Sequence, residues 1–240
     1  NATLIVVGDI TLGQVQALAT RYFGPVARRE LPVVKPPIEL QAPGERSITQ
    51  YLNHQIPNLS MNFNVPGQAT QADPRSVPAL ELLSELLAGG DSSVLKSKLW
   101  RGEELLIRAN AHYNGISRGD ELFSIGVTLN PEKIQPLSRV KERIWAEIQL
   151  LKGTAPSVNA LERARTRIIA QHVFRRDDLQ SLALHIGELD IAGLSLEQDE
   201  KYFEILQTIT PEDIQQAART FLTLDRLTTS YVLDKESRHE

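Results

Sequence analysis

The sequence of 240 residues has no cysteine and only one methionine, and its five histidines are scattered. The absence of cysteine excludes disulfides, thiolate nucleophiles and zinc sites built on thiolates. No apolar run approaches the roughly 18 residues of a membrane-spanning helix, since the longest, Leu4–Val7, has the length of a strand. The sequence therefore predicts a globular protein without a membrane span, and its 41% of hydrophobic residues can form a substantial core.

Neither sign of charge dominates the sequence, which carries 26 Lys and Arg residues against 30 Asp and Glu residues. Nucleic-acid binding needs concentrated positive charge, so this slight acidic excess argues against a nucleic-acid partner. The densest basic segment holds five arginines between residues 163 and 176, and Asp177 and Asp178 follow it at once. We interpret the basic segment as a solvated helix face.

The first 26 residues predict one strand and one helix. Thr3–Val7 is rich in β-branched residues, which favour a strand. Leu12–Phe23 has apolar residues at helical spacing, with Asp9 or Thr11 as the cap. One strand and one helix cannot enclose a core of their own. We therefore expect residues 1–26 to be the end of a preceding domain.

The start of the sequence and its prolines suggest the remaining organisation. The chain begins at Asn1 rather than at methionine, so we expect it to be a piece of a longer protein. Prolines recur through residues 27–46, which we predict to be a linker because proline supports neither a helix interior nor a central strand. Residues 47–240 then form one complete domain.

Hydrophobic periodicity predicts the elements of this domain. Strands are expected over residues 47–55, 59–65, 107–113, 122–129 and 226–233. The alternation in residues 47–55 and 59–65 predicts one buried face for each of these two strands. Helices are expected over residues 73–87, 91–100 (capped by Asp91 or Ser92), 134–152, 158–193 with a break at 175–178, and 210–221 capped by Thr210. This order predicts an α+β fold of two layers, in which helices pack on one face of an antiparallel sheet.

No group of residues in the sequence suffices for catalysis. Zinc hydrolysis typically uses two histidines on one helical turn beside a glutamate, and no two histidines here lie within five residues of each other. His185 and Glu188 lie at i and i+3, which we interpret as a local hydrogen bond; a small-molecule enzyme built on this pair is a minor alternative. The turn Gly89–Ser93 could cradle an anion, but it lacks the lysine of a phosphate loop, and Ser92 lies where a helix cap is expected.

Several short segments are weak signals alone but specific in their order and spacing. They are Asn1–Asp9 with Tyr22–Pro25, Val65–Gly67, Leu87–Ser93 with Leu99, Leu161–Arg165, and Ile209–Ile214 with Ala217–Arg219. Together they extend over residues 1–234. In this arrangement the chain resembles the pitrilysin and insulysin type of zinc metallopeptidases, which includes the mitochondrial processing peptidases.

This resemblance implies a clamshell enzyme, in which catalytic domains carry zinc on an inverted H-x-x-E-H helix and partner domains close over the peptide. The chain would then hold the end of a catalytic domain, a linker and one non-catalytic domain, with the zinc motif upstream of Asn1. No catalytic residue, metal ligand or cofactor is expected within it. The implied partners are its own catalytic domain, a peptide substrate and a homologous subunit, and export to the periplasm is favoured over the cytoplasm.

Active members of the family carry an arginine and a tyrosine seven residues apart after the glycine-rich turn. The register of this sequence places Trp100 and Ile107 there, or Arg101 and Arg108 after a slip of one residue. Neither choice supplies the tyrosine, so we do not assign the pair. Its absence suggests the second domain of a longer enzyme.

Two further expectations follow from the resemblance. The substrate-facing candidates are Arg101 and the turn residues Gly89, Gly90 and Ser92. The alternative function is a scaffold or inactive subunit that has kept the fold without peptidase function. Whether the parent protein has two domains or four is left open.

Overall fold

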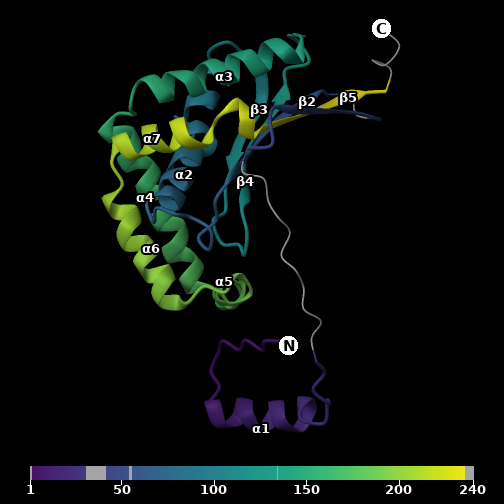
Figure 1. The fold of residues 1–240 in the computed structure, drawn as a ribbon, viewed down its shortest axis with the longest axis vertical. Helices are drawn as coiled ribbons and strands as arrows, with labels where there is room; N and C mark the ends of the chain where they lie inside the picture. Colours follow the sequence, from purple (N-terminus) through teal and green to yellow (C-terminus); the bar gives the residue numbers. More distant parts are fainter. Residues whose placement is uncertain (1, 31–41, 54–55, 134, 236–240) are drawn as a thin grey trace.

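The computed structural model describes residues 2–30, 42–53, 56–133 and 135–235, and it has a sheet layer and a helical layer (Figure 1). The strands are β1 (Arg46–Leu52), β2 (Asn58–Val65), β3 (Leu106–His112), β4 (Glu121–Leu129) and β5 (Leu227–Asp234). The helices are α1 (Leu12–Phe23), α2 (Ser76–Ser84), α3 (Leu137–Gly153), α4 (Val158–Asp177), α5 (Leu179–Ala192), α6 (Leu196–Thr208) and α7 (Pro211–Phe221). The α+β prediction is confirmed.

The five strands form one sheet in the order β1-β5-β2-β4-β3. β5, β2, β4 and β3 pair antiparallel, as predicted. The edge pair differs, because β1 runs parallel to β5, with Arg46 opposite Thr228 and Leu52 opposite Asp234. The topology explains this exception. β1 and β2 run in opposite directions, and a closing strand inserted antiparallel to β2 has to run parallel to β1.

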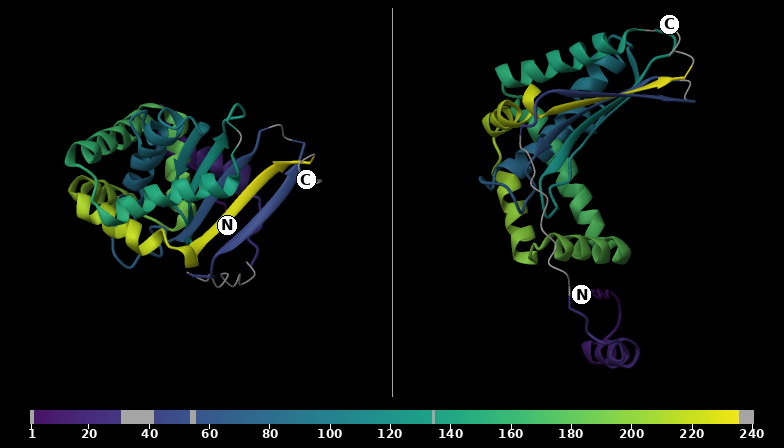
Figure 2. Two further views of the ribbon diagram at one scale, coloured as in Figure 1. Left: turned by 90° about the horizontal axis from the view of Figure 1, so that it is seen from above. Right: turned by 45° about the vertical axis from the view of Figure 1, so that its right-hand side comes forward.

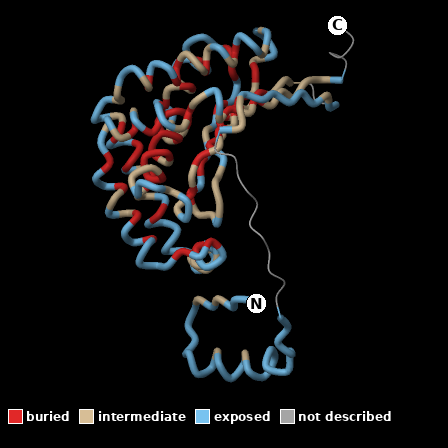
Figure 3. The backbone as a smooth tube through the Cα atoms, in the orientation of Figure 1, coloured by how far each residue is buried: buried red, intermediate tan, exposed pale blue. Residues whose placement is uncertain are grey.

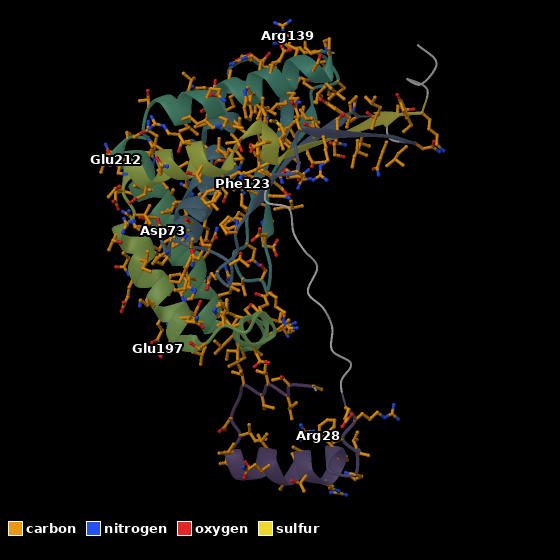
Figure 4. The ribbon with its side chains drawn as sticks, viewed as in Figure 1. Arg28, Asp73, Phe123, Arg139, Glu197 and Glu212 are labelled. Carbon is orange, nitrogen blue, oxygen red and sulfur yellow. The ribbon has the colours of Figure 1, made fainter. Side chains whose placement is uncertain are left out.

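The core lies between the sheet and the helices, where Figure 3 shows the buried residues concentrated. Alternate residues of β2 are buried, which is the pattern of a strand with one covered face. Phe63 of β2 is fully buried and its ring stacks on Trp145 of α3, with 6.4 Å between the ring centroids. Phe123 of β4, labelled in Figure 4, is also fully buried. The helix α2 contributes further buried leucines, Leu80, Leu82 and Leu83.

The prediction that residues 47–55 bury one face is wrong for residues 47–53, and residues 54 and 55 lie outside the described ranges. Every residue of β1 is exposed except Tyr51, which is intermediate. The reason lies in the architecture: β1 and β5 project beyond the helical layer (Figure 2), so no helix covers the edge strand.

Three other local predictions need correction. Residues 3–7 are not a strand, because a strand needs the N–H and C=O groups of a neighbouring strand and the described chain offers them none. The helix expected over 91–100 begins at residue 94, so neither Asp91 nor Ser92 caps it. The helix α6 was not predicted, although Ser195 and Gln198 form a capping box at its start.

The basic segment is only partly the solvated face that we expected. Arg165 is buried, and its guanidinium donates to the backbone oxygens of Leu206 and Ile209, which ties α4 to the end of α6. Arg167 pairs with Glu85. The predicted break in the helix is confirmed, since α4 ends at Asp177 and Asp178 caps α5.

Candidate functional site

The face of the sheet that the helices leave open is mainly polar. Its side chains come from alternate positions of β2 to β5, opposite to the buried set, and are at least partly exposed. Amides and hydroxyls predominate among them: Asn58, Ser60, Asn62, Asn64, Asn110, Ser124, Thr128, Thr228 and Ser230. On this face of the described strands β2, β3 and β4, the one arginine or carboxylate is Arg108 of β3. We call this surface the open sheet face.

A shallow hollow of about 350 Å³ lies on the open sheet face above Gly126 of β4. A Cβ atom at Gly126 would come within 2.9 Å of the Asn110 amide oxygen, so the glycine leaves room for that side chain. Arg108 and Ser230 also line the hollow. Its amide, hydroxyl and guanidinium groups can donate and accept hydrogen bonds, which suits the polar backbone of an extended chain.

The turn predicted to face a substrate packs on an ion pair. Arg167 Nε lies 2.7 Å from Glu85 Oε2. A Cβ atom at Gly89 would collide with the Glu85 carboxylate, and one at Gly90 would lie 2.7 Å from the Arg167 guanidinium. Both glycines therefore leave room for this pair where it lies, and the turn requires no ligand to explain them.

The other predicted residues lie beside this turn. Arg101 is exposed, and its guanidinium donates to the backbone oxygen of Asp91. Ser92 lines a cavity of about 200 Å³, together with Glu85 and Leu86 after α2 and with residues of α3, α4 and the segment joining them. The structure thus brings Arg101 and Ser92 to one turn, against the helical layer rather than on the open sheet face. A substrate-facing role for Arg101, Gly89, Gly90 and Ser92 stays a prediction.

His185 and Glu188 do not form the local hydrogen bond that their spacing suggested. His185 Nε2 instead lies 2.9 Å from Asp199 Oδ2 of α6, and both side chains are buried. Because α6 was not predicted, Asp199 could not be recognised as the partner. Its sequence offered one signal, a capping box at Ser195 that places Asp199 one turn into a helix.

Metal ligands and membrane spans are the two remaining features that the sequence analysis addressed. No three His, Cys, Asp or Glu side chains are grouped there so that they could hold a metal ion. No helix within the described ranges has the length and apolar character needed to cross a membrane.

Comparison with known proteins identifies what the chain is similar to. The family model described as the peptidase M16 inactive domain matches residues 1–168. No curated protein matches the sequence. Many solved structures do match the fold.

Three solved structures illustrate this similarity. A protease from Helicobacter pylori has a TM-score of 0.83 at 20% identity, over 95% of this chain and 53% of its own. A peptidase M16 inactive domain from Pseudomonas fluorescens has a TM-score of 0.71 at 18% identity, over 95% of this chain and 52% of its own. The periplasmic protease PqqL from Escherichia coli has a TM-score of 0.65 at 18% identity, over 95% of this chain and 25% of its own. The chain thus spans about half the length of the first two.

Proposed function

The chain belongs to the peptidase M16 family, as its inactive domain, and we propose that the protein it comes from is a zinc metalloendopeptidase. In this proposal the domain forms a non-catalytic wall of the peptide-binding chamber, and the zinc is held by a catalytic domain upstream of Asn1. The observation that carries the proposal is the family match over residues 1–168. A chain with no catalytic set of its own then acts by enclosing the substrate of its neighbour.

We assign residues 1–26 to that preceding domain, residues 27–46 to a linker and residues 47–240 to the non-catalytic domain. The support is that α1 has no buried residue, although Leu12, Tyr22 and Phe23 are large apolar side chains. Figure 4 shows the side chains of α1 away from the helical layer. A cavity of about 1230 Å³ separates residues 2–4 from the end of α1. The rest of a catalytic domain would fill this space and cover these side chains.

The surface that meets the catalytic domain is proposed to include α5. Ile5 lies against this helix, because a Cβ atom at Gly187 would be 3.3 Å from Ile5 Cδ1. Leu184 and Ile191 of α5 are large apolar residues that are more than half exposed. Apolar surface of this kind beside an existing contact is typical of an interface.

The open sheet face is proposed to line the chamber. A chamber that admits peptides of different sequence should bind them weakly, and a surface composed mainly of amides and hydroxyls hydrogen-bonds to water as well as to a peptide backbone. Arg101 and the turn from Gly89 to Ser92 remain additional candidates for contact with the substrate. We also propose a periplasmic location, which the similarity to a periplasmic protease favours.

The test is to express the longer protein and measure its zinc content and its cleavage of an unfolded peptide. We expect stoichiometric zinc and cleavage that a chelator abolishes, and neither in the 240-residue chain alone. Ser230→Trp would place a bulky side chain on the open sheet face and should raise KM at unchanged zinc content. Ser138→Trp, at an exposed position of α3, is the matched control.

Two outcomes would count against the proposal. A folded longer protein with neither zinc nor chelator-sensitive cleavage would favour the scaffold or inactive-subunit alternative. Stoichiometric zinc with cleavage by the 240-residue chain alone would contradict the non-catalytic role.

A further inference from the structure

A second cavity, of about 310 Å³, lies between β3 and the helices α2, α4, α5 and α6. In the view of Figure 1, α5 and α6 lie below the sheet. The ionisable side chains on its wall include Glu81, His172, Arg175, His185, Glu188 and Asp199. His112, at the end of the open sheet face, lines the cavity as well. Its volume is at the small end of the range for small-molecule sites.

Two buried imidazoles in the cavity wall have atoms without partners. His172 and His185 are each 8% exposed, and their ring centroids are 5.9 Å apart. A carboxylate can only accept a hydrogen bond, so the proton between His185 and Asp199 lies on His185 Nε2. This leaves His185 Nδ1 as an acceptor in the neutral ring. Within the described part of the chain, neither this atom nor His172 Nε2 has a hydrogen-bond partner.

Such atoms point to a missing hydrogen-bond partner. Buried polar atoms in folded proteins nearly always find a partner, because an unpaired one has lost its water without compensation. Burial, with Arg176 nearby, lowers the pKa of His172 to about 4. The ring is therefore neutral at physiological pH and has one nitrogen that can accept a hydrogen bond.

The carboxyl groups on the cavity wall outnumber the lysine and arginine side chains that could neutralise them. Among the described residues, the Glu81 carboxyl has no ion pair and no hydrogen bond. Burial raises its pKa to about 7; Arg175 opposes this shift, and Glu85 and Asp199 add to it. Glu85 itself is paired with Arg167, and Glu188 is exposed. The one lysine or arginine on the described cavity wall is Arg175, which is also exposed. Negative charge on the described cavity wall therefore exceeds positive charge.

We propose that this cavity binds an organic cation, the ammonium or guanidinium group of a basic side chain or of a free amine. Such a group brings several N–H donors, which the unpartnered imidazole nitrogens and the Glu81 carboxyl can accept. Its charge also compensates the carboxylates, which a neutral or anionic ligand cannot do. The proposal does not depend on peptidase activity of the longer protein.

The experiment titrates the 240-residue chain with butylamine at pH 8, where Glu81 is ionised. The imidazole NMR signals of His172 and His185 report binding, and calorimetry gives the dissociation constant. We expect both signals to shift, and Glu81→Gln to weaken binding about tenfold, the loss of one charged hydrogen bond. Glu188→Gln, at an exposed position, should weaken it less. Glu142→Gln, on the exposed side of α3, should leave it unchanged.

Further probes separate the sources of the cation and define failure. A blocked Ala-Lys-Ala peptide that shifts the same two signals identifies the ligand as a basic peptide side chain, whereas a response to butylamine alone identifies a free amine. The proposal is overturned if butylamine shifts neither signal. It is also overturned if uncharged 1-pentanol shifts both equally, or if Zn²⁺ alone binds stoichiometrically at these histidines while butylamine does not.

Discussion

The helices α1 and α7 both begin with a capping box, but α1 is exposed whereas α7 packs on the core. Thr11 caps α1 in a box with Gln14, and Thr210 caps α7 in a box with Asp213. Nevertheless α1 buries none of its residues, whereas α7 buries Ile214 and two alanines against the core. A capping box therefore determines where a helix begins, and a partner surface determines what it buries. The described chain supplies that surface for α7 and not for α1.

The largest test of this comparison uses two phenylalanines. Phe63 in β2 is fully buried, and Phe23 in α1 is 61% exposed. We expect Phe63→Ala to lower the free energy of unfolding by about 3–5 kcal/mol, because it removes an aromatic ring and leaves a cavity. Phe23→Ala should change it by less than about 0.5 kcal/mol. Urea denaturation of both variants provides the measurement.

One outcome of this test would contradict the exposure of α1. If Phe23→Ala destabilises the 240-residue chain as much as Phe63→Ala does, then α1 is packed on the core in solution. In the longer protein, by contrast, we expect Phe23→Ala to be destabilising, because the proposed catalytic domain would bury the ring.

A second test compares Glu81, in the domain that contains α7, with Glu30, in the N-terminal region that contains α1. Glu81 lines the cavity beneath the sheet, and its folded-state pKa is about 7 because burial disfavours its charged form. The unfolded chain releases this proton near pH 4.5, so the folded protein loses stability as pH rises from about 4.5 to 7. The loss is up to about 3 kcal/mol. Glu81→Gln should abolish it, so the variant should be more stable than wild type at pH 8.

The readout has to be the difference between wild type and variant at each pH. His172, in the same cavity, has its pKa lowered to about 4, so its contribution has the opposite sign: stability is lost as pH falls from about 6.5 to 4. Asp199, Glu85, Glu188, Arg175, His185 and Tyr113 also line the cavity, and their effects largely cancel in the difference. Glu30→Gln, in the exposed N-terminal region, is the control and should show no pH-dependent difference. An equal stability of Glu81→Gln and wild type at pH 8 would contradict the burial of this charge.

The capping boxes themselves provide a third, smaller test. Thr210→Ala removes the acceptor for the Asp213 backbone N–H, and we expect a loss of about 1 kcal/mol in unfolding free energy. Thr11→Ala removes the same bond to Gln14. It should leave global unfolding unchanged and reduce only the helical circular dichroism of α1. Equal losses in the two variants would mean that both helices unfold in one cooperative unit.

Local signals predicted most of the fold. Alternation identified β2 and β4, and a cap followed by proline identified α7, because these signals depend on neighbouring residues only. The same reasoning failed for residues 3–7, whose β-branched side chains satisfy strand propensity without a partner strand. It also assigned β1 a buried face, although no helix reaches that edge. Both errors concern contacts that a local pattern does not contain.

The candidate sites were less predictable than the fold. The open sheet face follows from the polar half of each alternating strand, so its composition could be read once the strands were paired. The cavity could not be found in this way, because its walls come from α2, β3, α4, α5 and α6. Its central contact joins His185 to Asp199 across 14 residues and two helices. Only the packing of these helices brings the two side chains together.

The smallest expected effect comes from the largest change to the chain, removal of residues 1–30. The helix α1 in this region has no buried residue. The contact between Ile5 and Gly187 of α5 involves only the side chain of Ile5. We expect the shortened chain to unfold with a free energy within about 0.5 kcal/mol of the full chain, measured by urea denaturation. A loss above about 2 kcal/mol would show that the region belongs to the core domain. An unchanged value, combined with a destabilising Phe23→Ala in the longer protein, would mean that α1 belongs structurally to the domain before it.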